Sequence, residues 1–210
     1  MTRSGSFILL ATLGGGLLAC GSNNSKSPTD PLDLVPLDQA VSGWTVDQAK
    51  NKQPGERAMT AATETQAGAL IDGGFENYYQ EPNIPKMFLY QNYTNSTLAA
   101  APEGATLRLY IFEMSSVDQA KGIYTAILQR PNYSTRAGME GDWAPTEPIV
   151  GTESRFQDTG SQWWINFHQD VFYVELLLDP SAGPAPDFTP GNTGTKQESV
   201  RFAQAIASKI

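Results

Sequence analysis

The clearest alternation of apolar and polar side chains lies within residues 107–128. Residues 107–112 alternate between aliphatic side chains and larger or polar ones, and this period of two predicts a strand with two distinct faces. From residue 117 to residue 128 the apolar positions recur every three or four residues, which predicts one stripe of an α-helix. Ser116 and Gln119 match a capping box at the start of that helix. The segment therefore predicts a strand that leads directly into a helix.

Apolar periodicity predicts further elements on both sides of this strand and helix. The expected elements are an edge strand at 42–46, a helix at 63–79, strands at 86–93, 149–157, 161–168 and 171–178, and a helix at 195–210. Thr195 and Glu198 match a second capping box, at the start of the last helix. Together the elements predict an α+β fold, an antiparallel sheet of about five or six strands with about three helices packed on one face.

The strands at 161–168 and 171–178 predict a hairpin with two unlike faces. If Gln169 and Asp170 form the turn, His168 lies opposite Val171 and the register follows outward. One face then carries only apolar residues, namely Trp163, Ile165, Phe167, Phe172, Val174 and Leu176. The other face is mixed and carries Trp164, Asn166, His168, Val171, Tyr173 and Glu175. We therefore expect the apolar face to lie inside the protein and the mixed face outside.

The first nineteen residues are typical of a secretory signal peptide. Arg3 supplies a positive charge, and the uncharged run from Phe7 to Leu18 is shorter than the about 20 apolar residues that a transmembrane helix needs. The run ends in Leu17-Leu18-Ala19-Cys20, which resembles a bacterial lipobox. The resemblance implies cleavage before Cys20 and acylation of this cysteine, with palmitate as a typical acyl group. We therefore expect a membrane as the first partner, through the lipid anchor.

The residues after the cysteine predict location and domain boundaries. Gly21 stands where enterobacterial lipoproteins of the inner membrane carry aspartate, so the resemblance favours the outer membrane, with the periplasmic and the surface face both open. Residues 20–36 contain three prolines and few apolar side chains, which predicts a flexible tether. The remaining residues, 37–210, suit a single α+β domain.

Composition excludes some classes of function. Cys20 is the only cysteine, so the mature protein has no internal disulfide and its stability must come from a packed core. Removal of Arg3 with the signal leaves 13 of the 14 basic residues against 22 acidic ones, a net charge of −9. This balance opposes binding to phosphate groups, so we expect no nucleic-acid partner.

Two segments resemble a family of uncharacterised bacterial lipoproteins. Residues 71–78, IDGGFENY, are similar to that family's I-[DN]-G-G/A-A-E-x-Y helix. Residues 110–124, YIFEMSSVDQAKGIY, are similar to its V-Y-D-M-G-S-P-x-D-A-x-G-x-Y segment, and the hairpin at 156–174 lies where the family has an aromatic hairpin. The chain departs from the family pattern at Phe75, Val117 and Asp170. The resemblance implies the fold and the envelope location, and it implies no particular activity.

Few residues combine into a candidate catalytic or metal site. Asp72 and Glu76 are four positions apart on an expected helix, so they are weak candidates for binding a divalent cation or for an acid–base pair. His168 is the only histidine, and the sequence contains no nucleophile elbow, phosphate-binding loop or dinucleotide-binding motif. We therefore expect no catalytic residues, no cofactor and no metal.

The mixed face of the hairpin is the best candidate for binding. Its candidate residues are Trp164, Asn166, His168, Tyr173 and Glu175, extended by Tyr110 and Arg108 of the strand at 107–112. Aromatic rings beside polar groups suit stacking on a sugar or contact with a protein. The alternative is that a second layer, such as Trp44 or the segment 131–148, covers these rings. The sequence thus favours a non-enzymatic envelope protein that binds a protein or a saccharide. The competing hypothesis is a hydrolase of envelope polymers that uses Asp72, Glu76 or Glu175.

Overall fold

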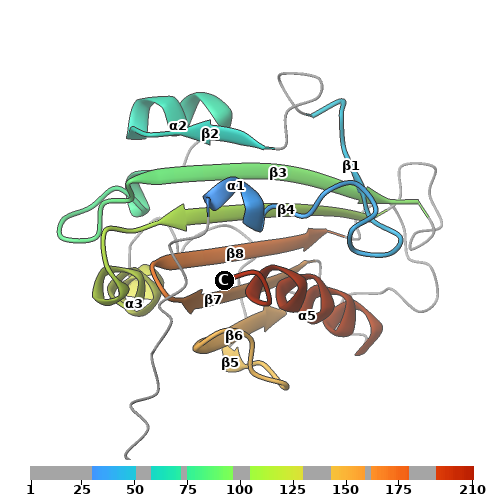
Figure 1. Ribbon diagram of the computed structural model, residues 1–210. Helices are drawn as coiled ribbons and strands as arrows, with labels where there is room; N and C mark the ends of the chain where they lie inside the picture. The colour runs from blue at the N-terminus through green and yellow to red at the C-terminus, as the bar shows by residue number, and fades with distance from the viewer. Residues whose placement is uncertain are drawn as a thin grey trace, which may run out of the picture.

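The computed structural model describes residues 30–50, 58–71, 75–96, 105–129, 143–158, 162–179 and 193–210. Their strands form one eight-stranded antiparallel sheet in the order β1-β3-β4-β8-β7-β6-β5, with β2 also paired to β3 (Figure 1). The strands are β1 (Thr45–Val46), β2 (Met59–Ala61), β3 (Met87–Asn95), β4 (Ala105–Glu113), β5 (Ala144–Pro145), β6 (Glu153–Asp158), β7 (Trp163–Gln169) and β8 (Phe172–Asp179). The predicted α+β class is confirmed, and the sheet is larger than the about five or six strands expected.

Helices flank this sheet at several points along the chain. Those that the structure describes are α1 (Pro31–Leu34), α2 (Glu64–Leu70), α3 (Val117–Ala126) and α5 (Thr193–Ala207), with the 3-10 helices η1 (Phe75–Asn77) and η2 (Ile127–Gln129). The start of α3 matches the sequence prediction. The Gln119 amide donates to Ser116 Oγ at 3.2 Å, and Gln119 Oε1 accepts from the Ser115 amide at 3.0 Å. Side chains thus bond two amides that no carbonyl within the helix can reach.

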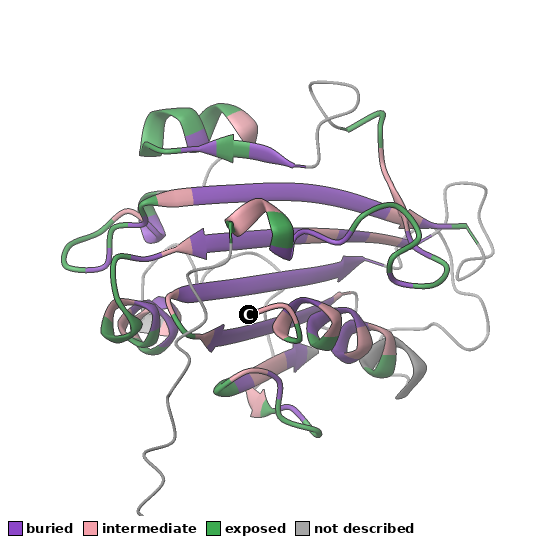
Figure 2. Cartoon of the chain, viewed as in Figure 1, coloured by how far each residue is buried: buried purple, intermediate pink, exposed green. Residues whose placement is uncertain are grey.

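Large side chains cover both faces of the sheet, and each face has its own core. On one face, mainly aliphatic residues of β4, β7 and β8 pack against α1, Trp44 and α5. On the other face, aromatic residues of β3, β4 and β8 pack against α2, α3 and Tyr78. α1 and α5 lie on the viewer's side of the sheet in Figure 1, and Figure 2 shows that the central strands are buried almost throughout.

The helices are divided between the two faces of the sheet, whereas the sequence predicted them all on one face. Phe202, Ala203 and Ile206 of α5 cover the apolar face of the β7–β8 hairpin. Ile123 and Tyr124 of α3 cover the mixed face. Without a cover, each face would expose a large apolar surface to water, so each needs a cover of its own.

The β7–β8 hairpin turns one residue later than predicted. Asp170 and Val171 form the turn, and His168 pairs with Tyr173 instead of Val171. Asp170 takes a φ of 49°, a left-handed conformation that aspartate tolerates better than most residues. Because the cross-strand partner moves by two positions, the paired side chains keep their predicted faces. Val171 falls in the turn and packs against the apolar core, so its predicted place on the mixed face is wrong.

The helix predicted over 63–79 ends after residue 70. α2 begins after its N-cap Thr63, whose Oγ1 accepts from the Gln66 amide at 3.3 Å. Ile71 then takes an extended conformation, with φ −128° and ψ 148°. Residues 72–74 lie outside the described residues, and they include two glycines, which disfavour a helix. Glu76 lies on the separate 3-10 helix η1, outside α2, and Asp72 lies outside the described residues.

The folded domain begins closer to Cys20 than predicted. α1 starts after its N-cap Asp30, and Leu34 is fully buried in the same core as Phe202 and Ile206 of α5. Lys209, beside the C-terminus, donates to the carbonyl oxygen of Asp33 at 3.0 Å. Residues 30–36 thus belong to the domain and not to the tether predicted over 20–36, because their apolar side chains complete the core.

Glu198 joins the N-terminal segment to α5. Its carboxylate accepts from Trp44 Nε1 at 3.0 Å and from Arg201 Nη2 at 2.6 Å. Arg201 also donates to the carbonyl oxygen of Ser42 at 2.8 Å. α5 begins at Thr193, so Glu198 lies inside the helix and bonds to Trp44 and Arg201 instead of forming the predicted capping box with Thr195.

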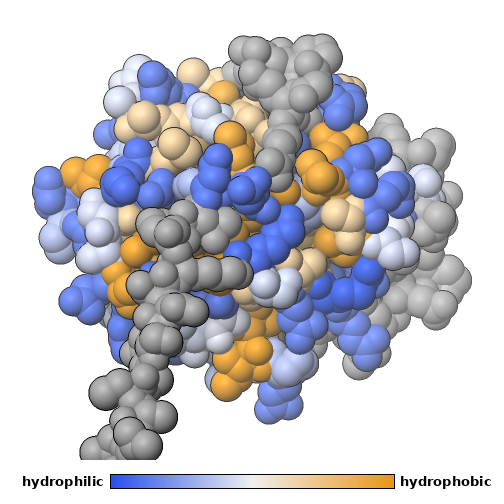
Figure 3. Space-filling view, viewed as in Figure 1, coloured by the Kyte–Doolittle hydropathy of each residue, from blue (hydrophilic) through white to orange (hydrophobic). Residues whose placement is uncertain are grey.

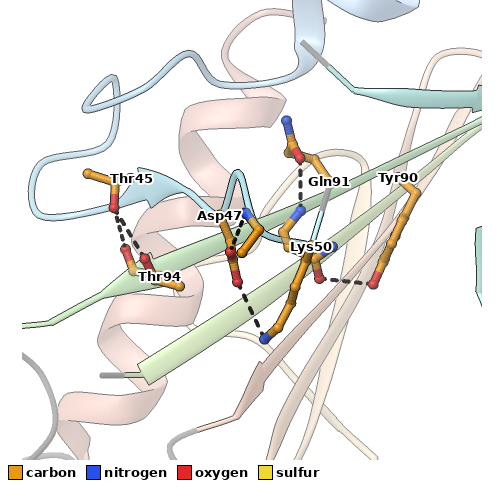
Figure 4. A network of polar contacts seen from close by, with 8 residues as sticks. Thr45, Asp47, Lys50, Tyr90, Gln91 and Thr94 are labelled. Atoms are coloured by element: carbon orange, nitrogen blue, oxygen red, sulfur yellow. Dashed lines mark hydrogen bonds and ion pairs between the residues drawn. The ribbon is translucent and has the colours of Figure 1, made fainter. Parts of the chain in front are cut away.

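Polar contacts hold the edge of the sheet at β1 (Figure 4). Thr45 Oγ1 lies 3.2 Å from Thr94 Oγ1 across the strand pair, and Lys50 Nζ lies 3.4 Å from Asp47 Oδ2. Hydrophilic side chains separate small hydrophobic areas on the surface that faces the viewer in Figure 3. Polar contacts therefore hold the β1 edge in place, whereas burial of apolar side chains stabilises the two faces of the sheet.

Phe202→Ala is expected to lower the free energy of unfolding by about 3–5 kcal/mol, because it leaves a cavity in a full core. The Phe202 ring is fully buried, and its centroid lies 4.8 Å from that of Tyr93 and 5.9 Å from that of Trp44. Val117→Ala is the control, since Val117 is 50% exposed and its truncation should cost less than about 0.5 kcal/mol. Urea unfolding measures both variants, and equal losses would contradict the assignment of Phe202 to the core.

Candidate functional site

The structure places the candidate binding residues on one face of three neighbouring strands. They are Trp164, Asn166 and His168 on β7, Tyr173 and Glu175 on β8, and Tyr110 and Arg108 on β4. Asn166 and Tyr110 both pair with Glu175, one from each side. Glu175 is therefore the centre of the group, and the neighbours predicted from the hairpin pattern do lie together.

This face is inside the protein. Arg108 is partly exposed, and each of the other candidate residues exposes 5% of its surface or less. α3 and Tyr78 pack over the face, and Trp143 packs at its margin. The expected outward aromatic surface is therefore not present, and a second layer covers the rings instead. That layer is built on α3, because the helix follows β4 after a short connection, whereas Trp44 belongs to the opposite core.

Two tyrosines hold the buried carboxylate of Glu175. Tyr78 OH donates to Glu175 Oε2 at 2.7 Å, and Tyr173 OH donates to Glu175 Oε1. The side chain of Glu175 is completely buried, so these hydrogen bonds replace the water that the carboxylate loses on folding. Tyr78 follows η1, which is far from β8 in the sequence, so this contact also ties the covering layer to the sheet.

A row of aromatic rings lies beside Glu175. The ring of Phe112 stacks on that of Tyr78 with centroids 4.5 Å apart, and it lies 4.9 Å from Phe88 and 5.7 Å from Tyr173. Such offset and tilted pairs add about 0.5–1.5 kcal/mol each beyond the burial of area. The row fills the space between the sheet and its cover, so a sugar cannot reach these rings in this arrangement.

His168 lies at the other end of the face, under α3. Its ring exposes 2% of its surface, and its centroid lies 5.1 Å from that of Tyr124. Neither ring nitrogen has a hydrogen-bond partner among the described residues. Glu153 on β6 is the nearest carboxylate, with Oε1 3.9 Å from His168 Nε2, and the same oxygen lies 3.3 Å from Lys121 Nζ.

Arg155 closes this end of the face. Its guanidinium carbon lies 4.0 Å from the centre of the Tyr124 ring and 5.3 Å from that of Trp143. Arg155 Nη2 also donates to the carbonyl oxygen of Tyr124. One side chain of β6 thus bonds to α3 through a ring face and a backbone oxygen together, which fixes the position of the helix over the sheet.

Burial keeps the two rings at this end neutral. It lowers the pKa of His168 below 6.5, a change that Glu153 opposes and that Lys121 and Arg155 strengthen. Burial also raises the pKa of the Tyr124 hydroxyl, which Arg155 lowers in part and Glu153 raises further. At pH 7 both side chains are therefore uncharged.

The remaining candidates do not form a second site in the described part of the chain. Glu76 is exposed on η1, whereas Asp72 and Cys20 lie outside the described residues. Within the described ranges, no group of three or more His, Cys, Asp or Glu side chains is arranged to hold a metal ion.

The sequence did not point to the residues that complete this face from outside the hairpin. Tyr78, Tyr124 and Arg155 come from three separate elements and converge on it. Arg155 carried one usable signal, because it lies two positions after Glu153 in a predicted strand and therefore shares a face with it. Tyr78 carried none, since the predicted helix over 63–79 placed it on a helical stripe.

Comparison of the chain with protein-family models, curated proteins and solved structures gave no match.

Tyr78→Phe is expected to lower the free energy of unfolding by about 1–3 kcal/mol, because the buried Glu175 carboxylate loses one donor. A double-mutant cycle with Glu175→Gln isolates the contact from other effects of each change. We expect a coupling of at least about 0.5 kcal/mol in urea unfolding. Strictly additive losses would show that the hydrogen bond contributes nothing to stability.

Proposed function

We propose that the protein is a lipid-anchored, non-enzymatic domain of the bacterial cell envelope that binds an envelope protein or saccharide. The observation that carries the proposal is the segment Leu17-Leu18-Ala19-Cys20 at the end of an uncharged apolar run. Its resemblance to a lipobox supports acylation of Cys20, and Gly21 supports the outer membrane. The likeness of residues 71–78 and 110–124 to a family of uncharacterised bacterial lipoproteins supports the same location.

The start of the folded domain limits its distance from the proposed anchor. Asp30, the N-cap of α1, is ten positions after Cys20. Even a fully extended chain spans at most roughly 36 Å over that length. None of the described helices combines the length and the apolar character needed to cross a membrane. The proposal therefore assigns membrane attachment to Cys20 and keeps the domain within reach of the lipid surface.

The burial of Glu175 argues against hydrolysis by this carboxylate. Both oxygens of this carboxylate accept hydrogen bonds from tyrosines, and its side chain is fully buried. A general acid or base must come within hydrogen-bond distance of the substrate, which this position does not allow. Glu76 is exposed and lies on η1, outside the helix that was expected to bring it beside Asp72.

The cover over the mixed face offers apolar side chains to a partner. Val117 at the start of α3 is 50% exposed, and Ile84 is 40% exposed. Ile84 adjoins Asn83, whose side chain packs so closely on Gly122 of α3 that a Cβ there would lie 2.6 Å from Asn83 Oδ1. Both apolar side chains thus belong to segments that pack together, and we propose that the partner contacts this part of the cover.

Cys20→Ser is expected to abolish labelling of the protein by radioactive palmitate and to release it from the membrane fraction. The reason is that Cys20 is the only thiol in the chain that can carry a lipid. Thr29→Ser, a similar small change in the same segment, is the control and should leave labelling unchanged. Continued labelling of Cys20→Ser would overturn the proposed anchor.

Ile84→Ser with Val117→Ser is expected to reduce co-purification of crosslinked envelope partners by several fold while the unfolding midpoint changes little, because both side chains are exposed. Leu37→Ser is the matched control, since Leu37 is 56% exposed and follows α1, which packs on the opposite face of the sheet. Equal loss in both variants, or no loss in either, would contradict a partner site on the cover.

A separate assay tests the non-enzymatic proposal, with purified envelope polymer as the substrate. Hydrolysis by the unsubstituted chain that is lost in Glu175→Gln or in Glu76→Gln would overturn that proposal.

A further inference from the structure

His168 is a buried titratable side chain that the proposed function does not use. It lies between β7 and α3, and neither ring nitrogen has a hydrogen-bond partner among the described residues. Most buried polar groups in proteins are hydrogen-bonded, and the His168 imidazole is an exception. Its nitrogen atoms therefore add no hydrogen bond to the stability of the described part of the fold. Its position is instead suited to a ring that must stay neutral while a helix packs over it.

Charged and titratable groups face His168 from each element that packs against it. α3 contributes Lys121 and the Tyr124 hydroxyl, β6 contributes Glu153 and Arg155, and β8 contributes the Tyr173 hydroxyl. Glu153 is the one carboxylate in this set, and its oxygen is shared with Lys121 and lies 3.9 Å from His168 Nε2. A proton on the ring would therefore meet two cations and one distant, already paired carboxylate.

We propose that protonation of His168 loosens α3 from the sheet, so that α3 is a proton-controlled cover over the mixed face. With the ring neutral, Tyr124 packs against it and Arg155 holds the helix by its carbonyl oxygen. When α3 moves away, the ring gains water and can hold a proton at its ordinary pKa near 6.5, whereas burial lowers the pKa in the closed arrangement. The open arrangement thus binds more protons.

The sign of the pH dependence follows from that difference. The contribution of the neutral ring to the closed arrangement is complete above pH 6.5, and it falls as the pH drops from 6.5 through the lowered pKa of the closed arrangement. α3 is the element that responds, because it is held by side-chain contacts, whereas β4, β7 and β8 are held by continuous backbone ladders. This inference does not depend on the lipid anchor or on a partner.

The first measurement is the titration of the imidazole in the full chain, purified in detergent. The chain contains one histidine, so its imidazole NMR signal needs no further assignment. We expect a midpoint below pH 6.5, moved lower by Glu153→Gln and higher by Lys121→Met. Glu113→Gln removes a similar ion pair, with Lys86 at 3.0 Å on another part of the sheet, and should leave the midpoint unchanged. A midpoint at or above 6.5 in the unsubstituted chain would overturn the proposal.

The second measurement is hydrogen exchange of the same chain at pH 7.5 and pH 5, corrected for the intrinsic change in exchange rate with pH. We expect the amides of α3 to exchange at least about three-fold faster at pH 5, and those of β4 and β8 to change less. His168→Phe keeps an aromatic ring against Tyr124 without a titrating group, and it should remove the selective change in α3. An equal pH response in α3 of the variant and the unsubstituted chain would overturn the proposal, as would no response in either.

Discussion

The fold depends on covering a sheet whose two faces both carry large apolar side chains. β4, β7 and β8 alternate large side chains above and below the sheet, and almost all of them are buried. A single layer of helices would leave one set in water, at a cost of about 25 cal/mol for each Å² of apolar surface. α5 with the N-terminal segment covers one face, and α3 with the segment around Tyr78 covers the other.

The two covers are held by different parts of the chain, and the difference bears on function. α5 is fastened to the segment 33–44, because Lys209 donates to the carbonyl oxygen of Asp33 in α1 and Glu198 accepts from Trp44 Nε1. α3 is fastened to β6 and β7, because Arg155 donates to the carbonyl oxygen of Tyr124 and the ring of His168 packs against that of Tyr124. The proposed anchor therefore leads into the face that α5 covers. The proposed partner contact and the titrating histidine both lie on the other side.

Buried polar groups on the mixed face explain why one pattern fits two interpretations. Trp164, Asn166, His168, Tyr173 and Glu175 have the composition of a binding surface, and they also form an interior in which hydroxyl and carboxylate groups satisfy one another. Burial needs a partner for each charge, and Tyr78 supplies a donor to Glu175 from a segment far away in the chain. The choice between surface and interior thus rests on contacts between distant residues.

The sequence by itself determined the features that depend on neighbouring residues. These are the strand and the capped helix within 107–128, the alternation of faces along the β7–β8 hairpin and the α+β class. The tertiary structure alone decided the register of that hairpin, the end of α2 at Leu70, the inclusion of α1 in the core and the side of the sheet on which α3 lies. The physical reason is the sequence separation over which each interaction acts. Periodicity and capping act over a few residues, whereas burial is decided by whichever distant segment supplies the missing surface or the missing hydrogen bond.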